Sequence, residues 1–135
     1  MNNLKLAPYI FFKGDCEEAM RFYQEVFGGE LSLHKFGEQG EEIPEGFAGK
    51  ISFAELISDG LRLRAVDSPI ANPEARKVEL QVFGDDEKVM REIFKKLAEG
   101  GKAKHEMEEK PWGGISGRLF DKFSLDWVVS VPAKK

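Results

Sequence analysis

The sequence predicts an α+β fold in which two similar βαβββ modules follow one another along the chain. Residues 12–21 and 82–91 correspond: each has an apolar strand end, a Gly-Asp turn, and an acidic helix start with a Met-Arg pair at the same place. Each stretch leads to a Gly-Gly pair, at 28–29 and at 100–101. A repeat of this kind indicates two copies of one supersecondary unit.

The first module is predicted as a strand, a helix and three further strands. Residues 4–12 are apolar and bounded by a glycine, which predicts a strand. Asp15 is expected to cap the helix that follows, and Gly28 or Gly29 to end it. Helical spacing predicts a buried stripe of Ala19, Phe22, Tyr23, Val26 and Phe27. Further strands are expected at 30–36, 49–58 and 61–66, the last two joined by an Asp-Gly turn.

The second module repeats this order. A strand is expected at 77–83, and Asp85 or Asp86 is expected to cap a helix that runs to about residue 99. The predicted inner stripe of that helix is Val89, Met90, Ile93, Phe94 and Leu97. The remaining strands are expected at 102–106, 115–121 and 125–131.

These modules are expected to form one domain over residues 1–135. Module one spans about 1–68, a linker stiffened by Pro69 and Pro73 spans about 69–75, and module two spans about 76–132. One module cannot bury both its sheet face and its helix alone. Two modules side by side would form a curved mixed sheet, a half-barrel cup with helices outside, whose concave face is the natural ligand site.

Composition and charge narrow the class of protein. With 41% hydrophobic and 33% charged residues, the 135-residue chain is an ordinary globular protein. Cys16 is the only cysteine, so no intramolecular disulfide is possible. We expect a cytoplasmic protein, because the N-terminus lacks signal-peptide features. We expect no membrane partner either, because no apolar stretch approaches the ~20 residues that span a bilayer.

The negative charge lies in one segment. The net charge is −4, and residues 36–49 contain four glutamates and no Lys or Arg, so the rest of the chain balances to zero. This distribution argues against a nucleic-acid partner, which would need a basic stripe. The acidic segment is interpreted as a solvated connection; the alternative is a lid that attracts a cationic ligand.

Several motifs together resemble the PhnB-like family. The series opens with Pro8-Tyr9-Ile10-Phe11-Phe12-Lys13-Gly14 and continues with residues 18–23 and 26–29. It then includes Ala54-Glu55-Leu56 with Asp59-Gly60, residues 67–68 and residues 97–102. It closes with Trp112-Gly113, Gly117, Asp121, Phe123 and Trp127. The resemblance covers nearly the whole chain. It implies the glyoxalase/bleomycin-resistance/dioxygenase fold of the vicinal-oxygen-chelate superfamily. Members often carry a demethylubiquinone methyltransferase label, but the sequence has no glycine-rich strand-to-helix loop that would support it.

The same resemblance implies positions for a divalent metal, and the residues there are not metal ligands. The positions fall on Pro8, on Lys77 or Val78, and on Val128, and Phe53 stands where many members have a histidine before Ala-Glu-Leu. With a one-residue shift of register, Glu79 becomes a single ligand. We therefore predict no metal and no other cofactor.

Six residues are predicted to contact a ligand in the cup: Phe53, Glu55, Arg64, Glu79, Gln81 and Trp112. Arg64 corresponds in the repeat to Val128 and is expected to point inward. Glu79 and Gln81 alternate with apolar neighbours that are expected to face the helix. Arg64 and Glu79 either bind a small polar molecule or pair with each other. Trp112 lies in a loop expected to border the opening, as a stacking surface, a plug at the core edge or a dimer contact.

Three other residues are interpreted as structural. His34 and His105 occupy equivalent places after the two helices, and we interpret them as ordinary strand residues far from the cup rather than as paired metal ligands. Cys16 lies in the first turn of a helix, where a thiol pKa can fall, but no histidine adjoins it in sequence and we interpret it as incidental.

Two function classes follow. The first is a metal-free protein that binds a small molecule in the cup, for resistance or sequestration, and an acidic segment with an aromatic cup would suit a cationic, partly planar ligand. The alternative is a metal-dependent enzyme of the vicinal-oxygen-chelate kind, a lyase, isomerase or dioxygenase. The resemblance also implies a homodimer.

Overall fold

The computed structural model describes residues 5–69, 78–111 and 113–133. The chain divides into two compact units, Met1–Asn72 and Pro73–Lys135. The predicted linker at 69–75 lies almost wholly outside the described residues, as does Trp112. Among the described residues, no helix is long and apolar enough to cross a membrane.

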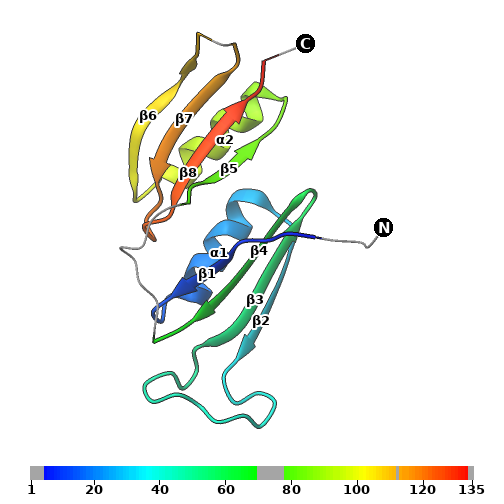
Figure 1. The fold of residues 1–135 in the computed structure, drawn as a ribbon, viewed down its shortest axis with the longest axis vertical. Coiled ribbons are helices and arrows are strands. Elements are labelled where there is room, and N and C mark those ends of the chain that lie inside the picture. The colour runs from blue at the N-terminus through cyan, green and yellow to red at the C-terminus, as the bar shows by residue number, and fades with distance from the viewer. Residues whose placement is uncertain (1–4, 70–77, 112, 134–135) are drawn as a thin grey trace. The chain divides into compact units, whose positions relative to one another are not determined.

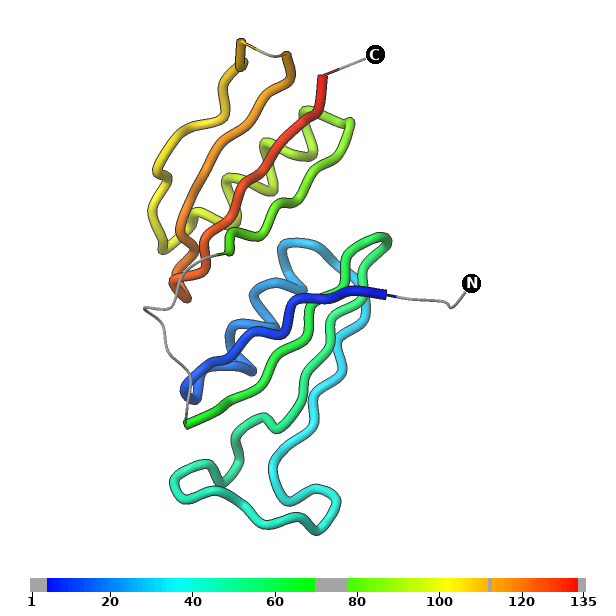
Figure 2. The backbone as a smooth tube through the Cα atoms, in the orientation of Figure 1, coloured from blue at the N-terminus to red at the C-terminus, as the bar shows by residue number. Residues whose placement is uncertain are grey.

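The first unit is one βαβββ module. Its elements are β1 (Tyr9–Phe12), α1 (Cys16–Phe27), β2 (Glu30–Lys35), β3 (Ile51–Ser58) and β4 (Leu61–Asp67). The strand order is β1-β4-β3-β2, and β1 runs parallel to β4 while the other pairs are antiparallel. Figure 1 shows α1 lying along one face of this sheet, and Figure 2 shows the long connection between β2 and β3.

The second unit repeats this topology. It contains β5 (Leu80–Phe83), α2 (Glu87–Ala98), β6 (Lys102–Glu109), β7 (Ile115–Phe120) and β8 (Asp126–Val131). Its strand order, β5-β8-β7-β6, has one parallel pair, β5 with β8. The predicted fold class, two tandem βαβββ modules with mixed sheets, is therefore confirmed.

Each core lies between a helix and its sheet. In the first module Met20 and Tyr23 of α1 are fully buried with Leu56 and Ala65 of the sheet. In the second, Phe94 and Leu97 of α2 are buried with Leu119, Trp127 and Val129. The predicted stripe of α2 is wrong at Val89, which lies in the first turn of the helix and is 51% exposed, whereas its neighbour Met90 is buried.

The expected cap of α1 is also wrong. Asp15 occupies the cap position but makes no side-chain capping hydrogen bond. Asp67, at the end of β4, accepts instead: its Oδ1 receives the N–H groups of Gly14 (2.7 Å) and Cys16 (3.0 Å), and its Oδ2 that of Ile51 (3.0 Å). In the second module the expectation holds, because Asp86 accepts from the Val89 N–H.

Candidate functional site

Each sheet presents one face to its helix and one face away from it. Because side chains alternate along a strand, the residues between buried positions share the second face. On β4 this places Arg64 between buried Leu63 and Ala65, and on β8 it places Val128 between buried Trp127 and Val129. We call this second face the open face of each module.

Strand register aligns the open-face residues in rows. In the first module one row reads Ser32, Glu55, Arg64 and Tyr9 across β2, β3, β4 and β1. The matching row in the second module reads His105, Arg118, Val128 and Gln81 across β6, β7, β8 and β5. The predicted correspondence of Arg64 with Val128 is thus seen in the register. At the same row position the first module has Glu55 and the second module has Arg118, so the two modules carry opposite charges there.

The two histidines are not in equivalent rows. His34 is the register partner of Phe53, whereas His105 is that of Arg118, because β6 is bulged beside His105. Neither lies apart from the open face. His34 stacks on Phe53 at 6.3 Å between ring centroids, and His105 lines a cavity described below. Both are strand residues, as expected, and both lie beside the open face; their distance from a ligand stays a prediction.

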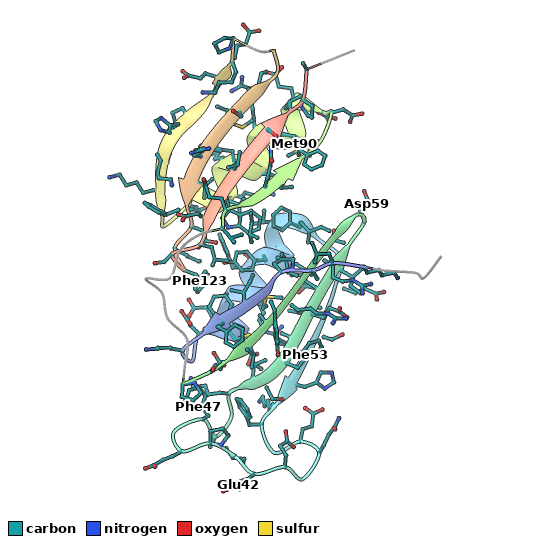
Figure 3. The ribbon with its side chains drawn as sticks, in the orientation of Figure 1. Glu42, Phe47, Phe53, Asp59, Met90 and Phe123 are labelled. Atoms are coloured by element: carbon teal, nitrogen blue, oxygen red, sulfur yellow. The ribbon has the colours of Figure 1, made fainter. Side chains whose placement is uncertain are left out.

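Three predicted site residues meet on the open face of the first module. The Nε of Arg64 donates to Glu55 Oε2 at 2.7 Å, and the Arg64 guanidinium lies 5.6 Å from the Phe53 ring centroid. Arg62 lies 3.7 Å from the same carboxylate oxygen. Figure 3 labels Phe53 on β3. Tyr9 extends the aromatic surface, with its ring 6.4 Å from that of Phe53.

The other described site residues lie in the second module. Glu79 forms an ion pair with Arg118 at 3.5 Å, and Gln81 Nε2 donates to Ser130 Oγ at 3.0 Å. Arg64 and Glu79 thus each have a partner within their own module, so a pair between them stays a prediction. Val78, expected to face the helix, is 74% exposed, whereas Gln81 lies on the open face as predicted.

The open face of the second module holds a cavity of about 770 Å³. That volume is in the range of small-molecule sites. Its lining is drawn from β5, β6, β7, β8 and the segments beside β7 and β8: Gln81, Phe83, His105, Lys110, Gly113, Ile115, Ser116, Gly117, Arg118, Val128, Ser130, Val131, Pro132 and Ala133. Of the predicted site residues that the structure describes, only Gln81 is among them. The residue that sequence reasoning missed is Arg118, which by strand register holds the row position that Glu55 holds in the first module.

The acidic segment is anchored to β2 at its start. Glu38 Oε1 lies 2.9 Å from His34 Nδ1, and Glu38 Oε2 accepts the Lys35 N–H at 3.0 Å. Both hydrogen bonds lower the pKa of the Glu38 carboxyl, and the one with His34 has the larger effect. Phe36 and Phe47 pack edge to face across the segment at 5.9 Å. Its role as a lid stays a prediction.

Cys16 is a core residue. Its side chain is fully buried, and burial, with a smaller effect of the Asp67 carboxylate, raises the pKa of the thiol. A helix N-terminus can lower a thiol pKa, but desolvation outweighs the helix dipole here, which agrees with the interpretation of Cys16 as incidental.

The side chains do not fit the metal that the superfamily implies. Within the described ranges, no three His, Cys, Asp or Glu side chains are grouped to hold an ion. Val128 presents an aliphatic side chain to the cavity, and Phe53 an aromatic ring to the open face of the first module. Pro8 offers only its carbonyl oxygen, which accepts the Arg64 N–H at 3.1 Å. We therefore derive no chemistry through a metal.

Comparison with known proteins places the chain in a family. A model of the family described as 3-demethylubiquinone-9 3-methyltransferase matches residues 4–130. Protein YjdN of Escherichia coli K12 is 28% identical over 141 residues, which cover 95% of each chain. The crystal structure of PA1353 from Pseudomonas aeruginosa is similar with a TM-score of 0.83 and 28% identity, over 94% of this chain and 96% of that one.

Two more distant structures are similar in fold. One is described as a putative 3-demethylubiquinone-9 3-methyltransferase, PhnB protein, from Bacillus cereus, with a TM-score of 0.70, 24% identity and coverage of 93% and 97%. The other, FosX from Listeria monocytogenes, has a TM-score of 0.70, 15% identity and coverage of 98% and 96%. With the match over residues 4–130, these findings confirm the PhnB-like resemblance: the chain belongs to the family described as 3-demethylubiquinone-9 3-methyltransferase, within the glyoxalase fold.

Proposed function

We propose that the protein binds a small organic molecule in the cavity on the open face of its second module, without a metal ion and without transforming it. The observation that supports this proposal is the cavity itself. It combines a volume of about 770 Å³ with a lining of both polar and apolar side chains. Small-molecule sites likewise combine apolar surface with placed polar groups.

The polar groups are arranged for hydrogen bonding to a ligand. Ser116 and Ser130 are register partners on β7 and β8, and the Gln81 amide donates to the Ser130 hydroxyl. Arg118 and Val128 form the next pair on the same face of these two strands. Two strands that pair directly hold these side chains in a fixed spacing, which lowers the cost of ordering them on binding.

Methyl transfer, which the family description names, is not the function we propose. Each sheet here is mixed, with one parallel pair, β1 with β4 and β5 with β8. The crevice that binds nucleotide-like cofactors in doubly wound folds lies at the carboxyl ends of several parallel strands. Neither module offers that arrangement.

Binding can be tested on the ¹⁵N-labelled protein in the presence of EDTA. A panel of small aromatic compounds, of anionic, neutral and cationic kinds, is titrated while backbone amide shifts are recorded. The proposal predicts saturable shifts at Ser116, Val128 and Ser130, with the ligand recovered unchanged after overnight incubation. Shifts confined to α2, or no shift with any compound, would contradict it. Conversion of a compound only after a divalent metal is added would favour the enzyme alternative.

A further inference from the structure

We infer that the cavity of the second module binds its ligand through an oxyanion, a carboxylate or a phosphate, with Arg118 as the anchoring residue. The inference rests on the proposed binding function and specifies the ligand class. The sequence favoured a cationic ligand, whereas this inference predicts an anionic one.

The charged side chains that line the cavity are basic. Arg118 and Lys110 are among the lining residues, with the imidazole of His105, and none of the described Asp or Glu residues is. His105 and Arg118 are register partners on β6 and β7. A cleft lined by one sign of charge concentrates ligands of the opposite sign.

Arg118 is less fully neutralised than Arg64, an arginine on the open face of the first module. There, Arg64 makes a hydrogen bond of 2.7 Å to Glu55 within one row. In the second module the matching row places Val128 beside Arg118, so the row supplies no carboxylate. Among the residues that the structure describes, Arg118 pairs only with Glu79, at 3.5 Å, and its side chain is 53% exposed. Its guanidinium therefore retains donors for a bidentate bond to an oxyanion.

The carboxylates near the two cations are weak competitors. Glu79 lies 3.5 Å from Arg118, and Glu108 lies 3.4 Å from Lys110 with its own side chain 70% exposed. Exposed ion pairs of this length are strongly screened by solvent and salt. A ligand oxyanion that enters the cavity can replace them with shorter, better aligned hydrogen bonds.

The apolar part of the lining indicates the rest of the ligand. Phe83, 65% exposed, stands on β5 beside Gln81's row, and Val128 and Val131 add aliphatic surface. An aromatic ring can pack against Phe83 while its acid group meets Arg118. The ligand class is therefore a small organic acid with an apolar or aromatic body.

The test uses four probes of similar size: benzoate, phenyl phosphate, benzamide and benzylamine. Each is titrated calorimetrically into the full-length protein at low salt in EDTA. We expect the two anions to bind and to bind more weakly at high salt, and the neutral and cationic probes to bind at least about tenfold more weakly. Benzoate and phenyl phosphate separate a carboxylate from a phosphate preference.

Three variants make the test specific. Arg118→Gln should weaken binding of the preferred anion at least about tenfold. Glu79→Gln should strengthen it by about two- to threefold, because it removes the competing carboxylate. Arg21→Gln is the matched control, since Arg21 is 58% exposed and paired with Glu17 on α1 of the first module, and it should change nothing.

The outcomes separate this inference from the proposed function. Binding of benzamide or benzylamine at the cavity in preference to the anions would overturn the oxyanion inference and leave the proposed function standing. So would equal affinity of the Arg118→Gln variant. No saturable binding of any of the four probes, in a protein whose unfolding transition is intact, would count against both.

Discussion

Replacing Asp67 tests the account of how the first module is held together. This side chain is 1% exposed and accepts three backbone N–H groups, two at the start of α1 and one at the start of β3. In Asp67→Asn, one oxygen becomes an amino group that faces an N–H donor. A hydrogen bond to a charged group contributes about 1.5–3 kcal/mol, so the loss of one such bond should lower the free energy of unfolding by about 2–3 kcal/mol.

Asp67→Ala would leave all three donors without their acceptor. The expected loss is on the order of 4–6 kcal/mol, close to the whole stability of a small domain. The asparagine variant is therefore the quantitative test, and the alanine variant is expected to unfold partly or wholly at room temperature.

Urea unfolding followed by circular dichroism measures these losses. The matched control is Asp15→Asn, because Asp15 is exposed and makes no capping hydrogen bond. It should change the free energy of unfolding by less than about 0.5 kcal/mol. Equal losses for both variants, or a loss below about 0.5 kcal/mol for Asp67→Asn, would refute the assignment of the cap to Asp67.

Three further predictions concern single positions. Burial raises the pKa of the Cys16 thiol, so only the unfolded state ionises above about pH 8.5. The free energy of unfolding, relative to that of Cys16→Ala, should therefore fall above this pH by up to about 1.4 kcal/mol per pH unit. Urea titrations from pH 7 to 10 measure this fall, and parallel curves for the two proteins would contradict it. Gly28 and Gly29 both have positive φ, but a Cβ at Gly29 would meet the carbonyl oxygen of Ile57, whereas a Cβ at Gly28 would meet nothing. Thermal unfolding should therefore show a loss of stability of several kcal/mol for Gly29→Ala and of about 1 kcal/mol for Gly28→Ala. Equal losses would count against the close approach at Gly29. Arg64→Ala should cost less than about 1 kcal/mol, because the Arg64 side chain is 45% exposed in its pair with Glu55; a larger loss would show that the pair supports the fold.

The order of elements could be predicted because it is encoded locally and twice. Gly-Asp turns, helical spacing and the Asp59-Gly60 hairpin signal are short-range patterns, and the repeat confirmed each by its copy. The cap of α1 could not be predicted in this way. Asp67 reaches Gly14 across 53 residues, so its role depends on β4 lying beside β1, while the local signal pointed to Asp15.

The candidate site was predicted less completely because it depends on register. The open-face rows that join Arg118 to His105 and Val128 are set by strand pairing and by bulges in β6, which leave no sequence signature. A one-residue shift of register moves every side chain to the other face. A two-residue turn like that of the first hairpin would pair Val128 with Leu119, whereas the structure pairs Val128 with Arg118. Charge alone drew attention to the glutamates of 36–49 instead.

The most direct test of the central claim is whether ligand binding survives the removal of metal. Protein treated with EDTA and shown by mass spectrometry to be free of metal is titrated with benzoate or phenyl phosphate, before and after addition of Zn²⁺, Mn²⁺, Ni²⁺ or Fe²⁺. The account predicts the same dissociation constant, within about twofold, in every condition, and no thermal stabilisation by metal alone. Binding that appears only after a metal is added, or about one tightly held ion per chain in the purified protein, would contradict it.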